Sequence, residues 1–285
     1  MAPWVALPAR HPVSMNAPNC GITFDPITPH LGAMITGVDF SRPLDTATHD
    51  AVLHAMADHL VLVAKEQNLM PEALRDLATS FGPAHLHHPD DGVIFADGMP
   101  EVLELRRSAN GEDLFGGGGW HADVTFLKPA GYFSFLNAKV VPEVGGDTGF
   151  ASTVTAFSTL SPAMQALLRD LKAVHSYDGP GRPEREGLTS VHPVVRRHPI
   201  SSAEGLYLNT MFVTRFENMS VDESRPLIDF LDRHMTQLAF TCRVRWKPNQ
   251  LVIWDNRFTL HLPCDDFTGQ PRHMIRCATL EPEAS

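Results

Sequence analysis

The chain has 285 residues, of which 43% are hydrophobic and 20% are charged, and this composition suits a globular protein with a buried core. The net charge is −10 and no stretch concentrates Lys or Arg, which argues against nucleic acid as a partner. No apolar run reaches membrane-spanning length. The four cysteines lack Cys-x-x-Cys spacing, so we expect reduced thiols and a cytoplasmic protein.

Residues 1–20 contain several prolines and no sustained apolar run. We therefore expect a flexible N-terminal tail here, with Met15 as an alternative start of the protein. Residues 21–285 show no internal repeat and no low-complexity tract. We expect them to form one domain.

The next part of the chain predicts two helices around a strand. Residues 46–60 carry apolar side chains at helical spacing, and LVLVAK at 60–65 is typical of a strand. Pro71 opens a second segment with helical spacing, which ends near Phe81.

After Phe81 the sequence changes to short β-branched or aromatic runs separated by Gly and Pro. These runs are VLELRR, VTFL, GYFSFLNAKVV, GLYLN, FTCRVRW, QLVIWD and HMIRCATL. Strands of this length with regular turn signals indicate a sandwich or a barrel.

Two further helices are expected within this β-rich part. One begins at Ser161, which can cap it, and a second covers roughly 220–238, where Ser220 and Glu223 have capping-box spacing. Pro226 should distort the first turns of the second helix. Residues 176–191 combine Gly, Pro and charge, which favours a long surface loop or an active-site lid.

The first candidate for chemistry is GGGGWHADVTF at 116–126, where His121 and Asp123 stand two residues apart. In a strand these side chains share one face, roughly 6 to 7 Å apart along the backbone. An imidazole and a carboxylate could then bind one metal ion. The pair alone is weak evidence, because His-x-Asp also occurs by chance.

The second candidate is the segment 254–280. His261 ends one predicted strand, and Arg272 and Arg276 lie four residues apart on the next, so that they share a face. Inward-facing arginines need anionic partners, and a dicarboxylate can supply them through bidentate hydrogen bonds. The alternative is a structural ion pair with Asp265 or Asp266.

Two histidines and one carboxylate that leave three adjacent coordination positions open are the ligand set of non-haem iron(II) oxygenases. Such chemistry needs two positions for a 2-oxo acid and one for oxygen. His121, Asp123 and His261 are the residues that could provide this set.

Several motifs together resemble the taurine dioxygenase family, in order and in approximate spacing. They are WHADVTF, GGDTGF, HPVVRRHP and WDNRFTLH, followed by the two arginines. The similarity begins at GAMITGVDF, residues 32–40, and extends through the last predicted strand. It implies a mainly β fold with flanking helices, a double-stranded β-helix (jelly roll).

The resemblance also implies specific roles. His121, Asp123 and His261 would bind Fe(II), while Thr148 and Arg272 would hold the distal carboxylate of 2-oxoglutarate. Arg276 would lie near the other carboxylate of 2-oxoglutarate or near the anionic end of the substrate. With O2 as the second co-substrate, the expected products are succinate, CO2 and a hydroxylated substrate, which could then break apart.

The resemblance extends only partly to the substrate pocket. His87 resembles the histidine that contacts sulfonate in taurine dioxygenases, and Phe212 resembles an aromatic wall residue, although both could equally be structural. Gly117 and Asp90 depart from the taurine enzymes, and the loop 176–191 looks shorter. We therefore expect a small anionic substrate other than taurine, and leave open whether the protein forms a homo-oligomer.

Two other functions compete with this hypothesis: a zinc hydrolase with the same three ligands, and an inactive binding protein of the same fold. The first leaves Thr148 and Arg272 without a role, and the second does not need a complete ligand set. His85, His88, His192 and His198 lack a second ligand at suitable spacing, so we expect them to be structural or surface residues.

Overall fold

The computed structural model describes residues 21–88, 93–108, 118–177 and 188–282. The expected flexible tail, residues 1–20, and the two substrate-pocket departures Asp90 and Gly117 lie outside these ranges. So does most of the expected lid, residues 178–187.

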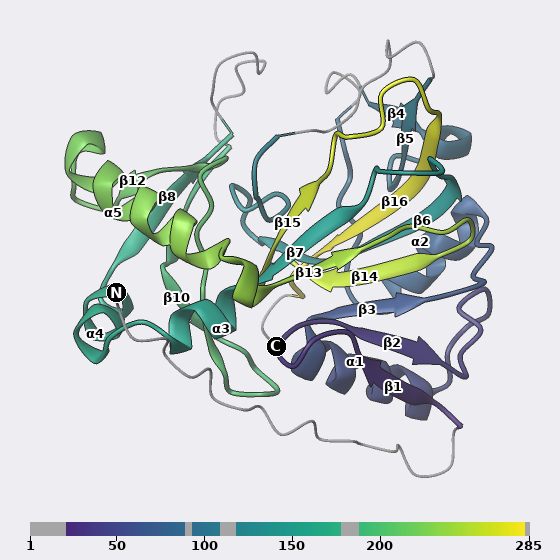
Figure 1. Ribbon diagram of the computed structural model, residues 1–285, viewed down its shortest axis with the longest axis horizontal. Helices are drawn as coiled ribbons and strands as arrows, with labels where there is room; N and C mark the ends of the chain where they lie inside the picture. Colours follow the sequence, from purple (N-terminus) through teal and green to yellow (C-terminus); the bar gives the residue numbers. More distant parts are fainter. Residues whose placement is uncertain (1–20, 89–92, 109–117, 178–187, 283–285) are drawn as a thin grey trace.

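The largest element is an eight-stranded sheet with the order β1-β2-β3-β14-β6-β16-β5-β4, in which only β2 and β3 pair in parallel. Figure 1 shows how its strands lie side by side. The strands are β1 (Thr23–Pro26), β2 (Ala33–Thr36), β3 (Val61–Ala64), β4 (Ile94–Phe95), β5 (Val102–Arg107), β6 (Gly131–Val140), β14 (Leu251–Asp255) and β16 (Arg272–Leu280).

A three-stranded sheet faces the large one. Its order is β13-β7-β15, with β13 at Thr241–Val244, β7 at Thr148–Ser152 and β15 at Thr259–Pro263. Phe150 of this sheet packs in one buried cluster with Trp254 and Met274 of the large sheet. The space between the two sheets is therefore filled by apolar side chains, as in a β-sandwich.

The other face of the large sheet is covered by helices α1 (Thr46–His59) and α2 (Pro71–Thr79). Met56 and Leu74 pack there with alternate residues of the central strands, such as Phe135 and Ile253. The central strands are thus buried on both faces, which explains why their sequences are apolar without alternation.

A smaller layer lies beside the sandwich (Figure 1). Helices from this layer pack together with a second three-stranded sheet, β12-β8-β9, in one buried cluster. The elements are α3 (Thr153–Ser158), α4 (Pro162–Arg169), α5 (Val221–Met235), β8 (Lys172–Ser176), β9 (Thr189–Pro193) and β12 (Val213–Phe216), with the pair β10 (Val195–Arg197) and β11 (Glu204–Leu206) and the short helices η2 (Ala96–Gly98) and η3 (Leu238–Phe240).

The structure confirms most predicted elements but corrects two. The run VTFL, residues 124–127, forms turns instead of a strand. Ser176 and residues 189–191 belong to strands β8 and β9, so the expected loop 176–191 is shorter. Pro226 lies within α5 without ending it, and the capping box of Ser220 and Glu223 is present.

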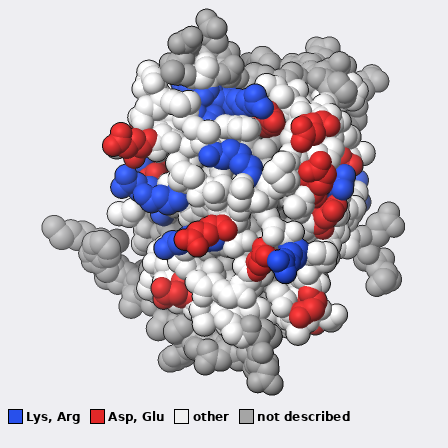
Figure 2. All heavy atoms as spheres, turned by 90° about the vertical axis from the view of Figure 1, so that its right-hand side faces the viewer, with Lys and Arg blue, Asp and Glu red and all other residues white. Residues whose placement is uncertain are grey.

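Charged side chains of both signs are interspersed on the face shown in Figure 2, where no continuous basic surface is visible. Among the residues described, no helix combines the length and apolar character that crossing a bilayer would need. Cys242, Cys264 and Cys277 are free thiols.

Candidate active site

His121 and His261 are held together by their own backbones. The N–H of His121 donates to the carbonyl of His261 at 3.0 Å, and the N–H of His261 donates back at 2.7 Å. These two bonds form an isolated antiparallel bridge between the loop before β6 and strand β15. Two residues that exchange both bonds lie directly opposite each other, so the imidazoles project from one place, with ring centroids 4.1 Å apart.

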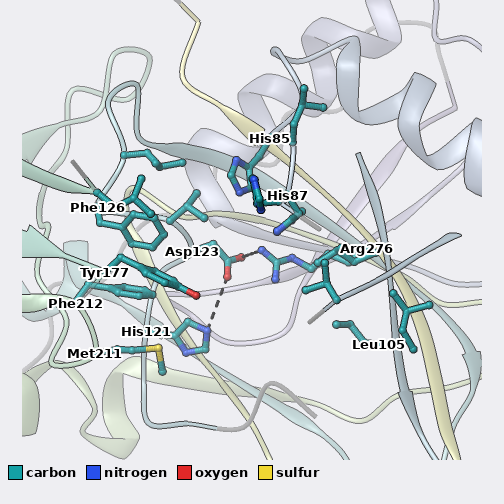
Figure 3. A pocket seen from close by; sticks show the side chains of 18 of the residues that line it. His85, His87, Leu105, His121, Asp123, Phe126, Tyr177, Met211, Phe212 and Arg276 are labelled. Carbon is teal, nitrogen blue, oxygen red and sulfur yellow. Dashed lines mark ion pairs between the residues drawn. The ribbon is translucent and has the colours of Figure 1, made fainter. Parts of the chain in front are cut away.

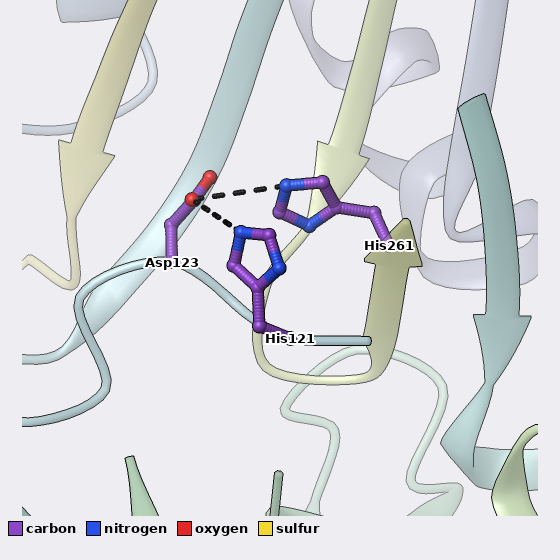
Figure 4. Close-up of side chains that lie close together, drawn as sticks. All are labelled: His121, Asp123 and His261. Atoms are coloured by element: carbon purple, nitrogen blue, oxygen red, sulfur yellow. Dashed lines mark ion pairs between the residues drawn. The ribbon is translucent and has the colours of Figure 1, made fainter. Parts of the chain in front are cut away.

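Asp123 completes a cluster with the two histidines (Figure 4). Its Oδ1 lies 3.8 Å from Nε2 of His121 and 3.8 Å from Nε2 of His261. One ligand atom from each of the three residues falls within 4.8 Å of the others, and all three side chains are buried.

The shape of the ligand loop differs from the expectation. His121 and Asp123 do not share the face of a strand, because the chain turns immediately after Asp123. Val124 has φ +45°, an uncommon backbone conformation for a β-branched residue. Strained residues of this kind cluster at functional sites, and here the turn brings the carboxylate back toward the histidines.

The protonation states suit metal binding. Nδ1 of His121 lies 3.0 Å from the carbonyl oxygen of Gly119, which requires a proton on Nδ1 and leaves Nε2 with a lone pair. Burial, with a further contribution from His121, lowers the pKa of His261 to about 3. Burial opposes ionisation of Asp123, but Arg276, the two histidines and Ser134 outweigh it and hold its pKa below the ordinary value.

The three residues therefore fit a divalent cation. Two atoms that bind one ion at about 2.1 Å each can be at most about 4.2 Å apart, and both separations of 3.8 Å satisfy this limit. Nδ1 of His261 is buried and has no hydrogen-bond partner in the structure. The donor set, two imidazoles and an ionised carboxylate, is the facial set of non-haem iron sites.

A cavity of about 480 Å³ opens above His121 and Asp123 (Figure 3). Aromatic side chains, Phe126, Tyr177 and Phe212, lie on one side of it, and Leu105 lies on the other. The remaining lining residues are His85, Leu86, His87, His88, Val93, Ile94, Leu103, Glu104, Val124, Leu127, Leu188, Met211 and Arg276.

Arg276 and His87 provide the polar groups deep in this cavity. Nη2 of Arg276 lies 3.0 Å from Oδ2 of Asp123, while its Nε is buried without a hydrogen-bond partner. Burial and the nearby Arg276 charge lower the pKa of His87 to about 3. His87 is therefore neutral at pH 7 and can offer a hydrogen bond but no positive charge.

Thr148 is the first residue of β7 in the three-stranded sheet, and Arg272 is the first residue of β16 in the large sheet. Thr148 is buried, and its Oγ1 accepts a hydrogen bond from Nε1 of Trp246 at 3.0 Å. Because an indole N–H can only donate, the Thr148 hydroxyl hydrogen stays available for another acceptor. Arg272 is 3% exposed, and its burial lowers its pKa to about 10 despite an opposing effect of Cys264.

Cys264 interacts with the surroundings of both residues, since its charge affects Arg272 and its backbone bonds beside Thr148. Its N–H donates to the carbonyl of Asp147, the residue before Thr148, at 2.8 Å. Of the two carboxylates considered as structural partners, Asp265 contacts Arg107 and Asp266 contacts Arg243.

The other histidines agree with expectation or leave it untested. His85 and His88, expected to be structural or surface residues, are at least partly exposed, and both line the cavity. His198 is a structural residue as expected, since it is buried beside Asp255 and Arg257. Tyr177 was missed altogether, because a single tyrosine beside an irregular segment gives no periodic signal.

Residues 23–278 match the model of the taurine catabolism dioxygenase TauD, TfdA family. The chain belongs to this family. An alpha-ketoglutarate-dependent sulfate ester dioxygenase of Pseudomonas putida is 35% identical over 275 residues, which cover 90% of this chain and 89% of that protein. The similarity therefore extends over nearly the full length of both proteins.

Solved structures of the TauD family agree with this result. A taurine dioxygenase from Burkholderia xenovorans superposes with a TM-score of 0.79 at 31% identity, over 91% of this chain and 89% of that one. AAD-2 in complex with Mn(II) and N-oxalylglycine superposes with a TM-score of 0.78 at 28% identity, over 93% and 99%. The expected family and jelly-roll fold are thus confirmed.

Proposed function

We propose that this protein is an Fe(II)- and 2-oxoglutarate-dependent dioxygenase that oxidises a small anionic substrate with an apolar body. The observation that carries the proposal is the convergence of His121, Asp123 and His261, the first two of which line a mostly apolar cavity. Membership of the TauD family supports it, because relatives are named as dioxygenases that depend on alpha-ketoglutarate.

The ligand roles follow from the geometry. His121 and His261 would bind the metal through Nε2, and Asp123 through Oδ1, since these are the atoms that face one another. When bound, Fe(II) would activate O2, which is the oxidant that converts a C–H bond into C–OH, while 2-oxoglutarate would be oxidised to succinate and CO2.

The distal carboxylate of 2-oxoglutarate would meet Thr148 and Arg272. A buried guanidinium and an available hydroxyl hydrogen are suitable donors for a carboxylate, and charge-assisted hydrogen bonds of this kind are the stronger ones. A zinc hydrolase would have no use for this second anion site, which is why we prefer the oxygenase.

The substrate would place its anionic group near Arg276 and His87. Arg276 contributes the charge and His87, being neutral, a hydrogen bond. The body of the substrate would lie against Phe126, Tyr177 and Phe212. A sulfate ester or sulfonate with an apolar chain fits a cavity with an anion-binding end and an aromatic wall. The similarity to the sulfate ester dioxygenase named above supports this substrate class.

The protein's own residues would orient this substrate and exclude water. The aromatic rings form a continuous wall, with centroids of Phe126 and Phe212 5.0 Å apart and those of Phe126 and Tyr177 4.9 Å apart. If the oxidised carbon carries a sulfate or another leaving group, the hydroxylated product would break into a carbonyl compound and the free anion.

The free thiols Cys242, Cys264 and Cys277 support a reducing, cytoplasmic location.

The first test is anaerobic addition of Fe(II) and 2-oxoglutarate. The expected result is a weak visible absorption band from the complex, which a zinc hydrolase or an inactive binding protein would not give. The second is a panel of alkyl sulfates, sulfonates and aryloxy acids, assayed for succinate release. His121→Ala and Asp123→Ala should abolish substrate-dependent succinate formation, and wild-type turnover in both variants would refute the proposal.

A further inference from the structure

Asp123 is held by a buried network of Ser134 and Asn256, for which no role was predicted from the sequence although Asn256 lies in the motif WDNRFTLH. Ser134 on β6 donates its hydroxyl to Oδ2 of Asp123 at 2.7 Å. Asn256, just after β14, accepts the backbone N–H of Asp123 at 3.0 Å. Both residues are fully buried, with exposed fractions of 0% and 1%. Ser134 therefore holds the carboxylate of Asp123, and Asn256 holds its backbone.

The orientation of the Asn256 amide follows from its partners. The N–H of Asp123 and Nε1 of Trp254 both contact one amide atom at 3.0 Å. Because both groups can only donate, that atom must be the oxygen. The amide nitrogen then points to Ser134 Oγ at 2.9 Å and to the Tyr132 carbonyl at 3.3 Å.

This orientation determines the direction of the Ser134 proton. Ser134 Oγ accepts from the Asn256 amide, so its only hydrogen is left for Oδ2 of Asp123. Nη2 of Arg276 forms an ion pair with the same oxygen at 3.0 Å. Oδ2 thus has one hydrogen-bond donor and one ion-pair partner, whereas Oδ1 is the oxygen that faces both histidines.

We propose that Ser134 is a positioning residue, which with Asn256 holds Asp123 so that Oδ1 alone is presented to the metal. The proposal rests on the metal centre described under the proposed function. A carboxylate that bound through both oxygens would occupy two of six coordination positions. Together with the histidines it would leave two positions instead of the three that a 2-oxo acid and oxygen require.

The test compares Ser134→Ala with Ser224→Ala. Ser224 is an equally buried serine on α5 whose hydroxyl also bonds, to the Phe216 N–H and the Ser220 carbonyl. Mn(II) is titrated into the metal-free full-length proteins by calorimetry, and unfolding in denaturant is followed in parallel. Loss of an outer partner of a metal ligand commonly weakens affinity 10- to 100-fold, so we expect about tenfold weaker Mn(II) binding for Ser134→Ala.

Ser224→Ala should lower stability similarly but leave Mn(II) affinity within about twofold of the wild type. Wild-type affinity in Ser134→Ala, or equal losses in both variants, would overturn the proposal. If Ser134→Ala does not fold, a crystal structure of the wild-type protein with Mn(II) decides. Binding through Oδ1 alone, with Ser134 still on Oδ2, supports the assignment, and binding through Oδ2 or both oxygens contradicts it.

A further possible result of the titration is that the wild-type protein does not bind Mn(II). It would show that the metal centre itself is wrong, and the role of Ser134 would be refuted with it. Normal Mn(II) binding by the wild type with an unchanged Ser134→Ala variant would instead leave the proposed function intact.

Discussion

Arg272 and Arg107 lie directly opposite each other on the paired strands β16 and β5, and both guanidinium groups contact the ring of Phe267. They differ in their surroundings. Arg107 contacts the carboxylate of Asp265, whereas Arg272 is buried beside Cys264. The pair therefore offers a matched comparison between a structural arginine and a proposed co-substrate arginine.

Arg272→Ala should raise the KM for 2-oxoglutarate by about tenfold or more, because a charge-assisted hydrogen bond is worth about 1.5 to 3 kcal/mol. Mn(II) affinity should change little. Arg107→Ala should leave the KM for 2-oxoglutarate near that of the wild type. Steady-state succinate assays at varied 2-oxoglutarate concentration make the comparison, and equal KM values for the two variants would contradict the assignment.

Phe212→Ala removes part of the aromatic wall and should change substrate selection. Burial of an apolar group of this size contributes about 1.5 to 3 kcal/mol, so kcat/KM for a long alkyl sulfate should fall about tenfold. A methyl or ethyl ester should be affected less. Phe230, which is 40% exposed on α5, supplies the control variant Phe230→Ala. A uniform loss over all chain lengths would indicate general damage to the site.

Gly131→Ala should disturb the metal ligands. A Cβ at Gly131 would lie 2.5 Å from the carbonyl oxygen of Asp123, which is backbone and must shift. We expect Mn(II) affinity to fall at least about tenfold. Gly119→Ala is the control, since a Cβ there meets nothing within 4 Å although His121 is only two residues away. Calorimetry on both variants tests this, and tight Mn(II) binding by Gly131→Ala would be the contrary result.

Asp255 should contribute to stability in a pH-dependent way. Burial opposes its ionisation, but Arg257 and His198 outweigh it and lower its pKa from 3.8 to about 2. A lowered pKa means that the ionised form stabilises the fold above about pH 4, and that this contribution is lost as the pH falls toward 2.

Asp255→Asn should therefore cost about 3 kcal/mol at pH 7, with a smaller difference from the wild type below pH 4. Denaturant unfolding at several pH values measures both effects. Glu204→Gln disrupts the more exposed pair with Arg169 and should cost less than about 1 kcal/mol. A pH-independent cost for Asp255→Asn would contradict the role of its charge.

The helices and the central strands could be predicted from the sequence because the spacing of their apolar residues follows from which side chains are buried. It also singled out His121, Asp123 and His261, which the structure brings together. The turn at Val124 could not be predicted, since a β-branched residue at positive φ contradicts local preference and is imposed by tertiary contacts. Ser134 was equally hidden, because one serine in an apolar run does not reveal which distant carboxylate it will meet.

The same reasoning explains why only some of the residues that line the cavity could be predicted from the sequence. Arg276 was expected near an anion, and its contact with Asp123 depends on the packing of the ligand loop against β16, which spacing cannot give. His85 and His88 enter the cavity from an irregular segment with no period. The periodicity of a strand predicts which side chains share a face, whereas the positions of loop side chains depend on tertiary contacts.

The backbone bridge between His121 and His261 makes the metal centre preorganised. Because each residue donates to the other, the two imidazoles keep their separation whether or not an ion is bound, and an arriving ion need order few further side chains. Ordering the ligand side chains lowers conformational entropy, which opposes metal binding. Here the folded protein already orders most of these side chains before the ion binds. The protein should consequently release its metal to a chelator and recover it while remaining folded, unlike small domains whose folding depends on the ion.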